Sequence, residues 1–98
     1  MRTPESFEKV EIDKYLKQIG AYVVKPTAMG FGASGTADRV CCLNGLFFVI
    51  EVKREGKEPT VIQNTRMDEV RAAGGWACWG TAEKVIAEID AWRMPSDH

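Results

Sequence analysis

The sequence predicts an α/β domain whose helices and strands follow the order α-β-β-β-α-β-α. Apolar residues recur at helical spacing in three segments, and β-rich runs lie between those segments. An Asn-Gly pair between two apolar runs also indicates a tight hairpin. A chain of 98 residues has room for one domain, 1–98, whose core we expect over about residues 5–93.

The first segment is typical of an amphipathic helix. Thr3 is a favourable cap, and Gly20 ends the apolar repeat that follows it. Glu8 points into the apolar face, where a carboxylate is costly unless a neighbouring group needs it. We expect a strand over residues 21–26 and a glycine-rich loop over residues 26–37.

The Asn-Gly pair at 44–45 lies between apolar runs at 38–43 and 46–53, which favours a hairpin with a type I′ turn. From such a turn the residues of the two strands pair one for one, so Asp38 should face Glu51. Carboxylates on directly opposed residues, roughly 5 Å apart at Cβ, repel each other, and one pKa is raised unless a cation lies between them. Because Mg²⁺ is commonly held by one or two carboxylates, these two acids are candidate metal ligands.

The second half of the chain completes the predicted order. Residues 54–60 are mostly charged and form a connection. A helix is expected over 61–73 and ends at the Gly-Gly pair 74–75. A short strand over 76–80 and a last helix capped by Thr81 follow.

The composition excludes two classes of protein. Hydrophobic residues make up 45% of the chain and charged residues 28%, which excludes disorder as the dominant state. The 13 lysines and arginines against 14 acids give a net charge of −1, which excludes binding to nucleic acid by bulk charge. A chain of this length has a thin core, so oligomerisation would help to stabilise it.

The three cysteines, Cys41, Cys42 and Cys78, lack C-x-x-C spacing and are odd in number. We therefore expect small buried side chains in a reducing compartment rather than a zinc site. The sequence has no secretory apolar region and no run near the ~18 apolar residues of a membrane span. These features predict a cytoplasmic protein with no membrane partner.

Lys53 lies two residues after Glu51, so strand alternation places both side chains on one face. A lysine beside a metal-binding carboxylate pair can stabilise the charge that develops on a phosphate. This combination indicates metal-assisted phosphodiester hydrolysis, with Glu8 as a third acid. The alternative is a cross-strand ion cluster on a half-solvated sheet, and the inward position of Glu8 favours the functional interpretation.

Three motifs follow one another along the chain: Gly35-Thr36-Ala37-Asp38-Arg39, then Phe48-Val49-Ile50-Glu51-Val52-Lys53, then Gln63. This ordered set resembles the PD-(D/E)XK nuclease superfamily, and most closely the small stand-alone VRR-NUC (virus-type replication-repair nuclease) proteins of phages and prophages. The resemblance extends over about residues 6–87. The sequence departs from the family pattern at Ala37, where the family usually has proline. This difference removes none of the candidate metal ligands.

The resemblance implies a PD-(D/E)XK core, in which helices flank a mixed central sheet. It assigns the active site to Glu8, Asp38, Glu51, Lys53 and Gln63. The Val52 carbonyl would be a further metal ligand, and Glu8 would reach the metal through water. The implied activity is that of a Mg²⁺- or Mn²⁺-dependent DNA endonuclease in phage or prophage replication, recombination or repair. Branched DNA such as a four-way junction is the implied substrate, and a symmetric homodimer would place two sites on two strands.

Gln63 also has a local interpretation. Thr60 and Gln63 have the spacing of a capping box, in which the glutamine reaches back to the backbone of the cap residue. The resemblance favours an active-site role, and the two roles are compatible. The G-x-G-x-x-G match at 30–35 precedes a strand rather than a helix, so no nucleotide cofactor is expected.

Lys25, Arg39 and Arg54 are candidate contacts to a DNA backbone, and the alternative for each is ordinary surface charge. Two other functions remain open on the same fold. A catalytically silent DNA-binding subunit would bind DNA without cutting it, and a host-directed interaction protein would bind a protein instead. The retained acids and Lys53 argue against the silent subunit.

Overall fold

The structure is a computed structural model and describes residues 4–27 and 35–93. The predicted cap at Thr3 and residues 28–34 of the predicted glycine-rich loop lie outside these ranges. The elements are α1 (Pro4–Gln18), β1 (Tyr22–Val24), β2 (Arg39–Leu43), β3 (Leu46–Val52), α2 (Val61–Ala72), β4 (Trp76–Gly80) and α3 (Ala82–Arg93). Their order is the predicted one.

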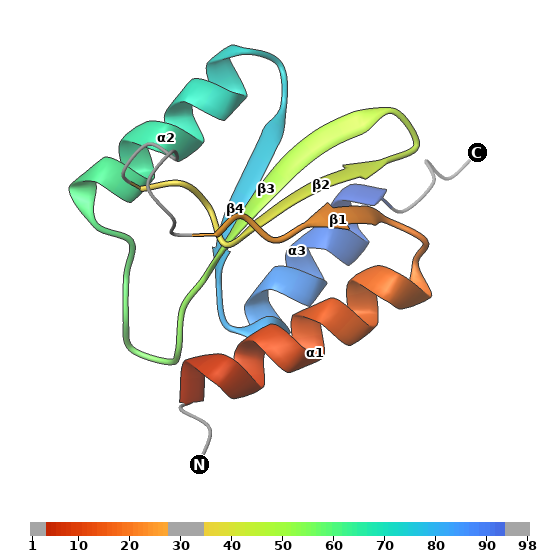
Figure 1. Cartoon of the computed structure of the whole chain (residues 1–98), viewed down its shortest axis with the longest axis horizontal. Coiled ribbons are helices and arrows are strands. Elements are labelled where there is room, and N and C mark those ends of the chain that lie inside the picture. The colour runs from red at the N-terminus through yellow and green to blue at the C-terminus, as the bar shows by residue number, and fades with distance from the viewer. Residues whose placement is uncertain (1–3, 28–34, 94–98) are drawn as a thin grey trace.

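The strands form one mixed sheet in the order β1-β2-β3-β4 (Figure 1). β1, β2 and β3 are antiparallel neighbours, whereas β4 lies parallel to β3. A parallel neighbour needs a crossover connection, which α2 supplies. The two hydrophobic clusters place α1 and α3 on one face of the sheet and α2 on the other. The expected mixed sheet flanked by helices is therefore confirmed.

The β2–β3 hairpin has the predicted turn and register. Asn44 and Gly45 have φ angles of 52° and 84°, and a type I′ turn requires positive values at both positions. The pairing then runs from Leu43↔Leu46 to Arg39↔Ile50. Asp38 lies one residue beyond that last pair, beside Glu51.

The main core lies between the sheet and the helices α1 and α3. Phe48, Ile50 and Val52 alternate along β3 and are fully buried there. The rings of Trp76 and Trp92 stack with their centroids 5.3 Å apart and close the end of this core. These two tryptophan rings thus contribute to packing.

Cys41 and Cys78 are buried in the core, as predicted, but Cys42 is exposed. The expectation was wrong for Cys42 because consecutive strand residues point to opposite faces of the sheet. Cys42 points to the face on which α2 packs, and α2 leaves this part of the face open to solvent.

Gly35 brings the chain that enters β2 against the start of α2. Its φ is +80°, and a Cβ there would lie 3.0 Å from the backbone carbon and oxygen of Ile62. Only glycine permits both the positive φ and this approach. The contact holds the segment before Asp38 close to the helical turn that carries Gln63.

Arg39 joins the start of β2 to α1. Its Nε and Nη2 donate to the two carboxylate oxygens of Asp13 at 2.7 and 3.0 Å, and its Nη1 donates to the Asp38 carbonyl at 2.7 Å. Arg39 is buried, with 8% of its surface exposed. This burial disagrees with the expected contact between Arg39 and a DNA backbone, because the guanidinium is held inside the fold, where it positions Asp38.

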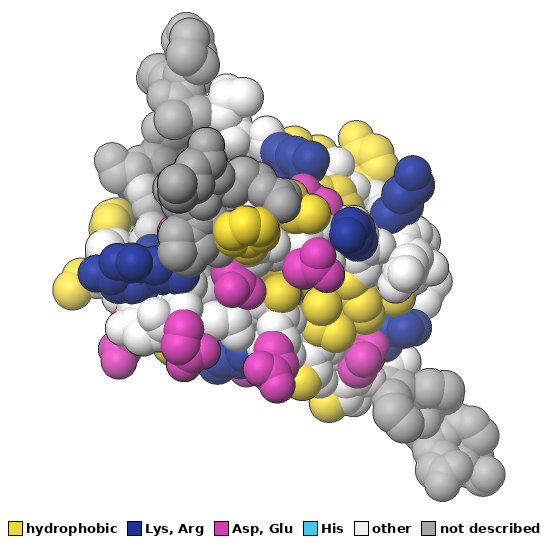
Figure 2. Space-filling view, turned by 90° about the horizontal axis from the view of Figure 1, so that it is seen from below, with side chains coloured by type: hydrophobic (Ala, Val, Ile, Leu, Met, Phe, Trp, Pro, Cys, Tyr) yellow, Lys and Arg dark blue, Asp and Glu magenta, His cyan; other side chains and the backbone are white. Residues whose placement is uncertain are grey.

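The surface seen in Figure 2 carries interspersed acidic and basic side chains, and its described part has no continuous basic area. Nucleic-acid binding on this face would have to depend on local groups, as the net charge suggests. None of the helices in the described ranges is long and apolar enough to cross a membrane.

Candidate active site

Asp38 is held at the end of the sheet by a backbone hydrogen bond. The amide of Val52 donates to Asp38 Oδ2 at 2.8 Å. The β2–β3 ladder has already ended at Arg39 and Ile50, so this carboxylate satisfies an amide that β2 no longer reaches. The hydrogen bond fixes Asp38 beside Glu51.

Glu51 is a buried carboxylate, with 4% of its surface exposed. Its Oε1 atom is buried and has no hydrogen-bond partner among the described residues. Burial raises the pKa of Glu51 to about 8, and the charge of Asp38 adds to this rise. Lys53 acts in the opposite direction. A further cation bound beside Glu51 would lower this pKa.

Gln63 caps α2, as predicted, and it also contacts Glu51. Its Oε1 accepts from the Thr60 amide at 2.8 Å, and its own amide donates to Thr60 Oγ1 at 3.2 Å, which completes the capping box of α2. Its Nε2 donates to Glu51 Oε2 at 2.9 Å. The Gln63 amide oxygen is thus used by the helix cap, and the Gln63 amide nitrogen is used by Glu51. This one side chain therefore links the start of α2 to the Glu51 carboxylate.

Lys53 lies just beyond β3 on the same face as Glu51. Its Nζ is 3.7 Å from Glu51 Oε2, and 14% of its side chain is exposed. Its amide donates to the carbonyl of Gly80 at 2.9 Å, so the backbone remains tied to the end of β4. The ammonium group is thus held at the carboxylate pair and reached from solvent on one side.

Glu8 has a different position from the other four predicted site residues. Its Oε1 accepts from the amide of Ala82 at 2.7 Å, at the start of α3. α1 and α3 pack on the face opposite Glu51. Glu8 therefore reaches the same end of the sheet from its other side and offsets the cost of its inward position by binding a helix N-terminus.

The two remaining candidate DNA contacts are exposed. Lys25 Nζ lies 3.3 Å from Asp13 Oδ2, and 62% of its side chain is exposed. Arg54 is exposed directly after Lys53. Both can meet a ligand from solvent, unlike Arg39.

Two residues that the sequence did not single out lie at the site. Lys9 Nζ is 3.6 Å from Asp38 Oδ1 and 3.4 Å from Glu5 Oε2. The charge of Glu5 also contributes to the raised pKa of Glu51. The i, i+4 spacing of Glu5 and Lys9 indicated an ion pair, but nothing local indicated that this pair faces Asp38.

The residues present fit a divalent cation. Two carboxylates lie together, one of them with an unpaired buried oxygen and a raised pKa, and a cation would relieve both conditions. No group of three or more His, Cys, Asp or Glu side chains with the geometry of a metal site occurs within the described residues. A two-carboxylate set suits Mg²⁺, which usually keeps several waters and binds substrate phosphate.

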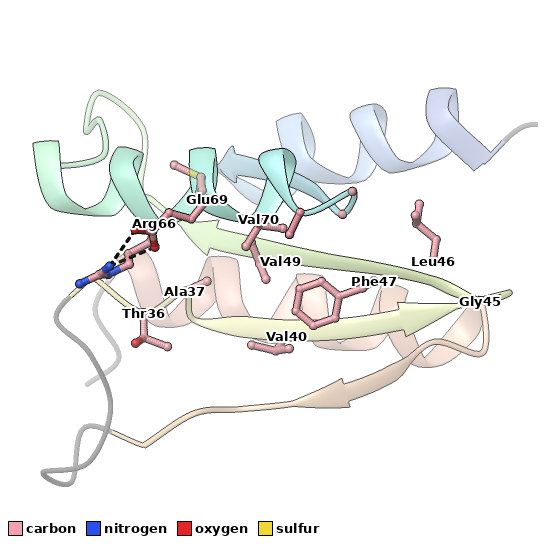
Figure 3. A pocket seen from close by; sticks show the side chains of 14 residues that line it. Thr36, Ala37, Val40, Gly45, Leu46, Phe47, Val49, Arg66, Glu69 and Val70 are labelled. Carbon is pink, nitrogen blue, oxygen red and sulfur yellow. Dashed lines mark hydrogen bonds and ion pairs between the residues drawn. The ribbon is translucent and has the colours of Figure 1, made fainter.

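An apolar cavity of about 570 Å³ lies beside this site, between α2 and the β2–β3 hairpin (Figure 3). Val40, Phe47 and Val49 form its sheet wall, and Val70 contributes from the helix. Arg66 donates to Glu69 at 3.0 Å at one end of the cavity. Its walls offer packing surface rather than groups for acid–base chemistry.

The four-stranded mixed sheet with helices on both faces agrees with the fold that the motifs predict. A solved structure described as a VRR_NUC domain shares this fold, with a TM-score of 0.78 and 21% sequence identity over 96% of this chain and 100% of that one. No family model matches the sequence, and neither does any curated protein. The resemblance expected from the motifs thus agrees with the fold.

Proposed function

We propose that this protein is a metal-dependent DNA endonuclease that hydrolyses phosphodiester bonds, acting as one domain over residues 1–98. The observation that supports this most strongly is the buried Glu51 beside the half-buried Asp38, with the Lys53 ammonium 3.7 Å from Glu51 Oε2. The likeness to a solved VRR_NUC domain adds support from the fold. Structural ion pairs rarely leave a buried carboxylate oxygen unpaired, as Glu51 does.

Asp38, Glu51 and the Val52 carbonyl would hold Mg²⁺ or Mn²⁺, with Glu8 acting through water. When bound, such an ion polarises a phosphate and lowers the pKa of a coordinated water. Lys53 stabilises the negative charge that develops on the phosphate. Gln63 holds Glu51 in one orientation through its Nε2 hydrogen bond.

We further propose that the substrate is branched DNA such as a four-way junction and that the active form is a homodimer. An exposed apolar sheet face supports the homodimer: Tyr22, Val24 and Phe47 are 69%, 43% and 47% exposed. Lys25 and Arg54 would contact the DNA backbone. The resemblance of the motifs supports a role in phage or prophage DNA replication, recombination or repair, in the cytoplasm of a bacterial host.

The test is a cleavage panel of four-way junction, linear duplex and single strand, each with Mg²⁺, Mn²⁺ or EDTA. We expect metal-dependent cutting with the junction cut fastest, and no cutting in EDTA. Junction binding without cutting under any condition would instead indicate a DNA-binding subunit. Light scattering on the same sample measures the dimer directly, and a monomeric mass at assay concentration would contradict it.

Gln63→Glu is expected to retain the helix cap but to lose the contact with Glu51. A glutamate still accepts from the Thr60 amide, whereas it cannot donate to Glu51 and adds a negative charge. We expect cleavage to fall about ten-fold, since a hydrogen bond to a charged group is lost. Gln63→Ala is the comparison, because it should also lose about 1 kcal/mol of cap stability in urea unfolding. Full activity of Gln63→Glu would remove Gln63 from the site.

A further inference from the structure

Lys9 is the cation on α1 that lies nearest Asp38. Its ammonium group is close to the Asp38 carboxylate oxygen that accepts no backbone hydrogen bond. Asp38 Oδ2 is occupied by the Val52 amide, whereas Oδ1 lies 3.6 Å from Lys9 Nζ. The two side chains are only partly exposed, at 33% and 23%, so solvent screens this pair less than a fully exposed one.

The same oxygen is the one that Asp38 can offer more readily to a divalent cation. Oδ2 has a second lone pair but already accepts the hydrogen bond from the Val52 amide, whereas Oδ1 accepts no backbone hydrogen bond. The ammonium group and a metal ion cannot both remain on that oxygen at close range, since like charges repel. Glu5 Oε2 lies 3.4 Å from Lys9 Nζ and can keep the released side chain at the helix.

We propose that Lys9 is the resting counter-ion of Asp38 and that a divalent cation displaces it on binding. The metal-free fold thus carries its own positive charge at the carboxylate pair, and this charge sets the affinity of the site for metal. The inference rests on the proposed metal-dependent function, because it concerns the same carboxylates. Lys9 is a positioning residue here and takes no part in bond cleavage.

The test is calorimetric titration of Mn²⁺ alone into the wild type, Lys9→Gln and Lys14→Gln. Lys14 is the matched control because it lies on the same helix and pairs with Glu11 at 3.4 Å, away from the site. We expect Lys9→Gln to bind Mn²⁺ about three-fold more tightly, because the ion no longer competes with the Lys9 ammonium group for Asp38. The effect is small because a partly exposed ion pair is weak. Lys14→Gln should match the wild type, and Lys9→Arg should restore wild-type affinity.

A thermal melt provides a second measurement that does not depend on activity. In EDTA, Lys9→Gln should melt below the wild type because Asp38 has lost its counter-ion, and saturating Mn²⁺ should remove this difference. Unchanged or weaker Mn²⁺ binding by Lys9→Gln would overturn the inference while leaving the proposed function intact. Failure of the wild type to bind Mn²⁺ would instead contradict the proposed function.

Discussion

Replacing Lys53 with methionine is expected to reduce DNA cleavage by about 100-fold or more while leaving the fold intact. Loss of one group that stabilises transition-state charge typically has an effect of roughly this size. Methionine retains the apolar part of the side chain, which is only 14% exposed, and removes the ammonium group 3.7 Å from Glu51 Oε2. Single-turnover cleavage in Mn²⁺ is the measurement.

Lys57→Met is the matched control for Lys53→Met, because Lys57 is exposed on the charged connection after β3. It should retain nearly all activity. Lys53 also lowers the pKa of Glu51, so Lys53→Met should shift the pH dependence of any residual activity upward. Cleavage by Lys53→Met within about two-fold of the wild type would mean that the ammonium group takes no part in the chemistry.

Glu51→Gln is expected to stabilise the metal-free protein at pH 8 and to abolish cleavage. Burial and the neighbouring Asp38 raise the pKa of Glu51 from 4.5 to about 8, so the folded state holds a proton that the unfolded state releases. The stability of the metal-free wild type therefore falls as the pH rises between these two values. Glutamine carries no charge at any pH, so the variant escapes this loss.

The stability gain of Glu51→Gln at pH 8 should be about 2–4 kcal/mol, or about 10 °C or more in melting temperature. Near pH 5 most of the difference should disappear. Differential scanning fluorimetry in EDTA at both pH values measures it, with Glu58→Gln, an exposed acid, as control. Mn²⁺ should then raise the melting temperature of the wild type but not of Glu51→Gln. A variant less stable than the wild type at pH 8 would show that Glu51 has a stabilising structural role.

The part of the site that depends on local pairing could be predicted from sequence. The Asn-Gly turn determines the hairpin register, and the register brings Asp38 beside Glu51. Strand alternation then places Lys53 with Glu51. The capping box brings Gln63 to the first turn of α2 in a defined orientation. Each of these inferences uses residues that lie close together in the sequence or are joined by one tight turn.

The contacts between distant elements could not be predicted in this way. Arg39 pairs with Asp13 and Glu8 binds the amide of Ala82, and both contacts depend on how the helices pack on the sheet. Sequence periodicity showed that Glu8 points inward but not which group meets it. Lys9 was missed for the same reason, because its partner Asp38 comes from another layer of the fold.

The measurement that tests the central claim most directly combines two titrations on one preparation of the wild type. The first measures Mn²⁺ binding by calorimetry, and the second measures the single-turnover rate of four-way junction cleavage over the same Mn²⁺ concentrations. If Asp38 and Glu51 form the metal seat of a nuclease, the rate should rise with occupancy and fall to background in EDTA. Cleavage that persists in EDTA, or an inert protein at full Mn²⁺ occupancy on every DNA form, would contradict this account.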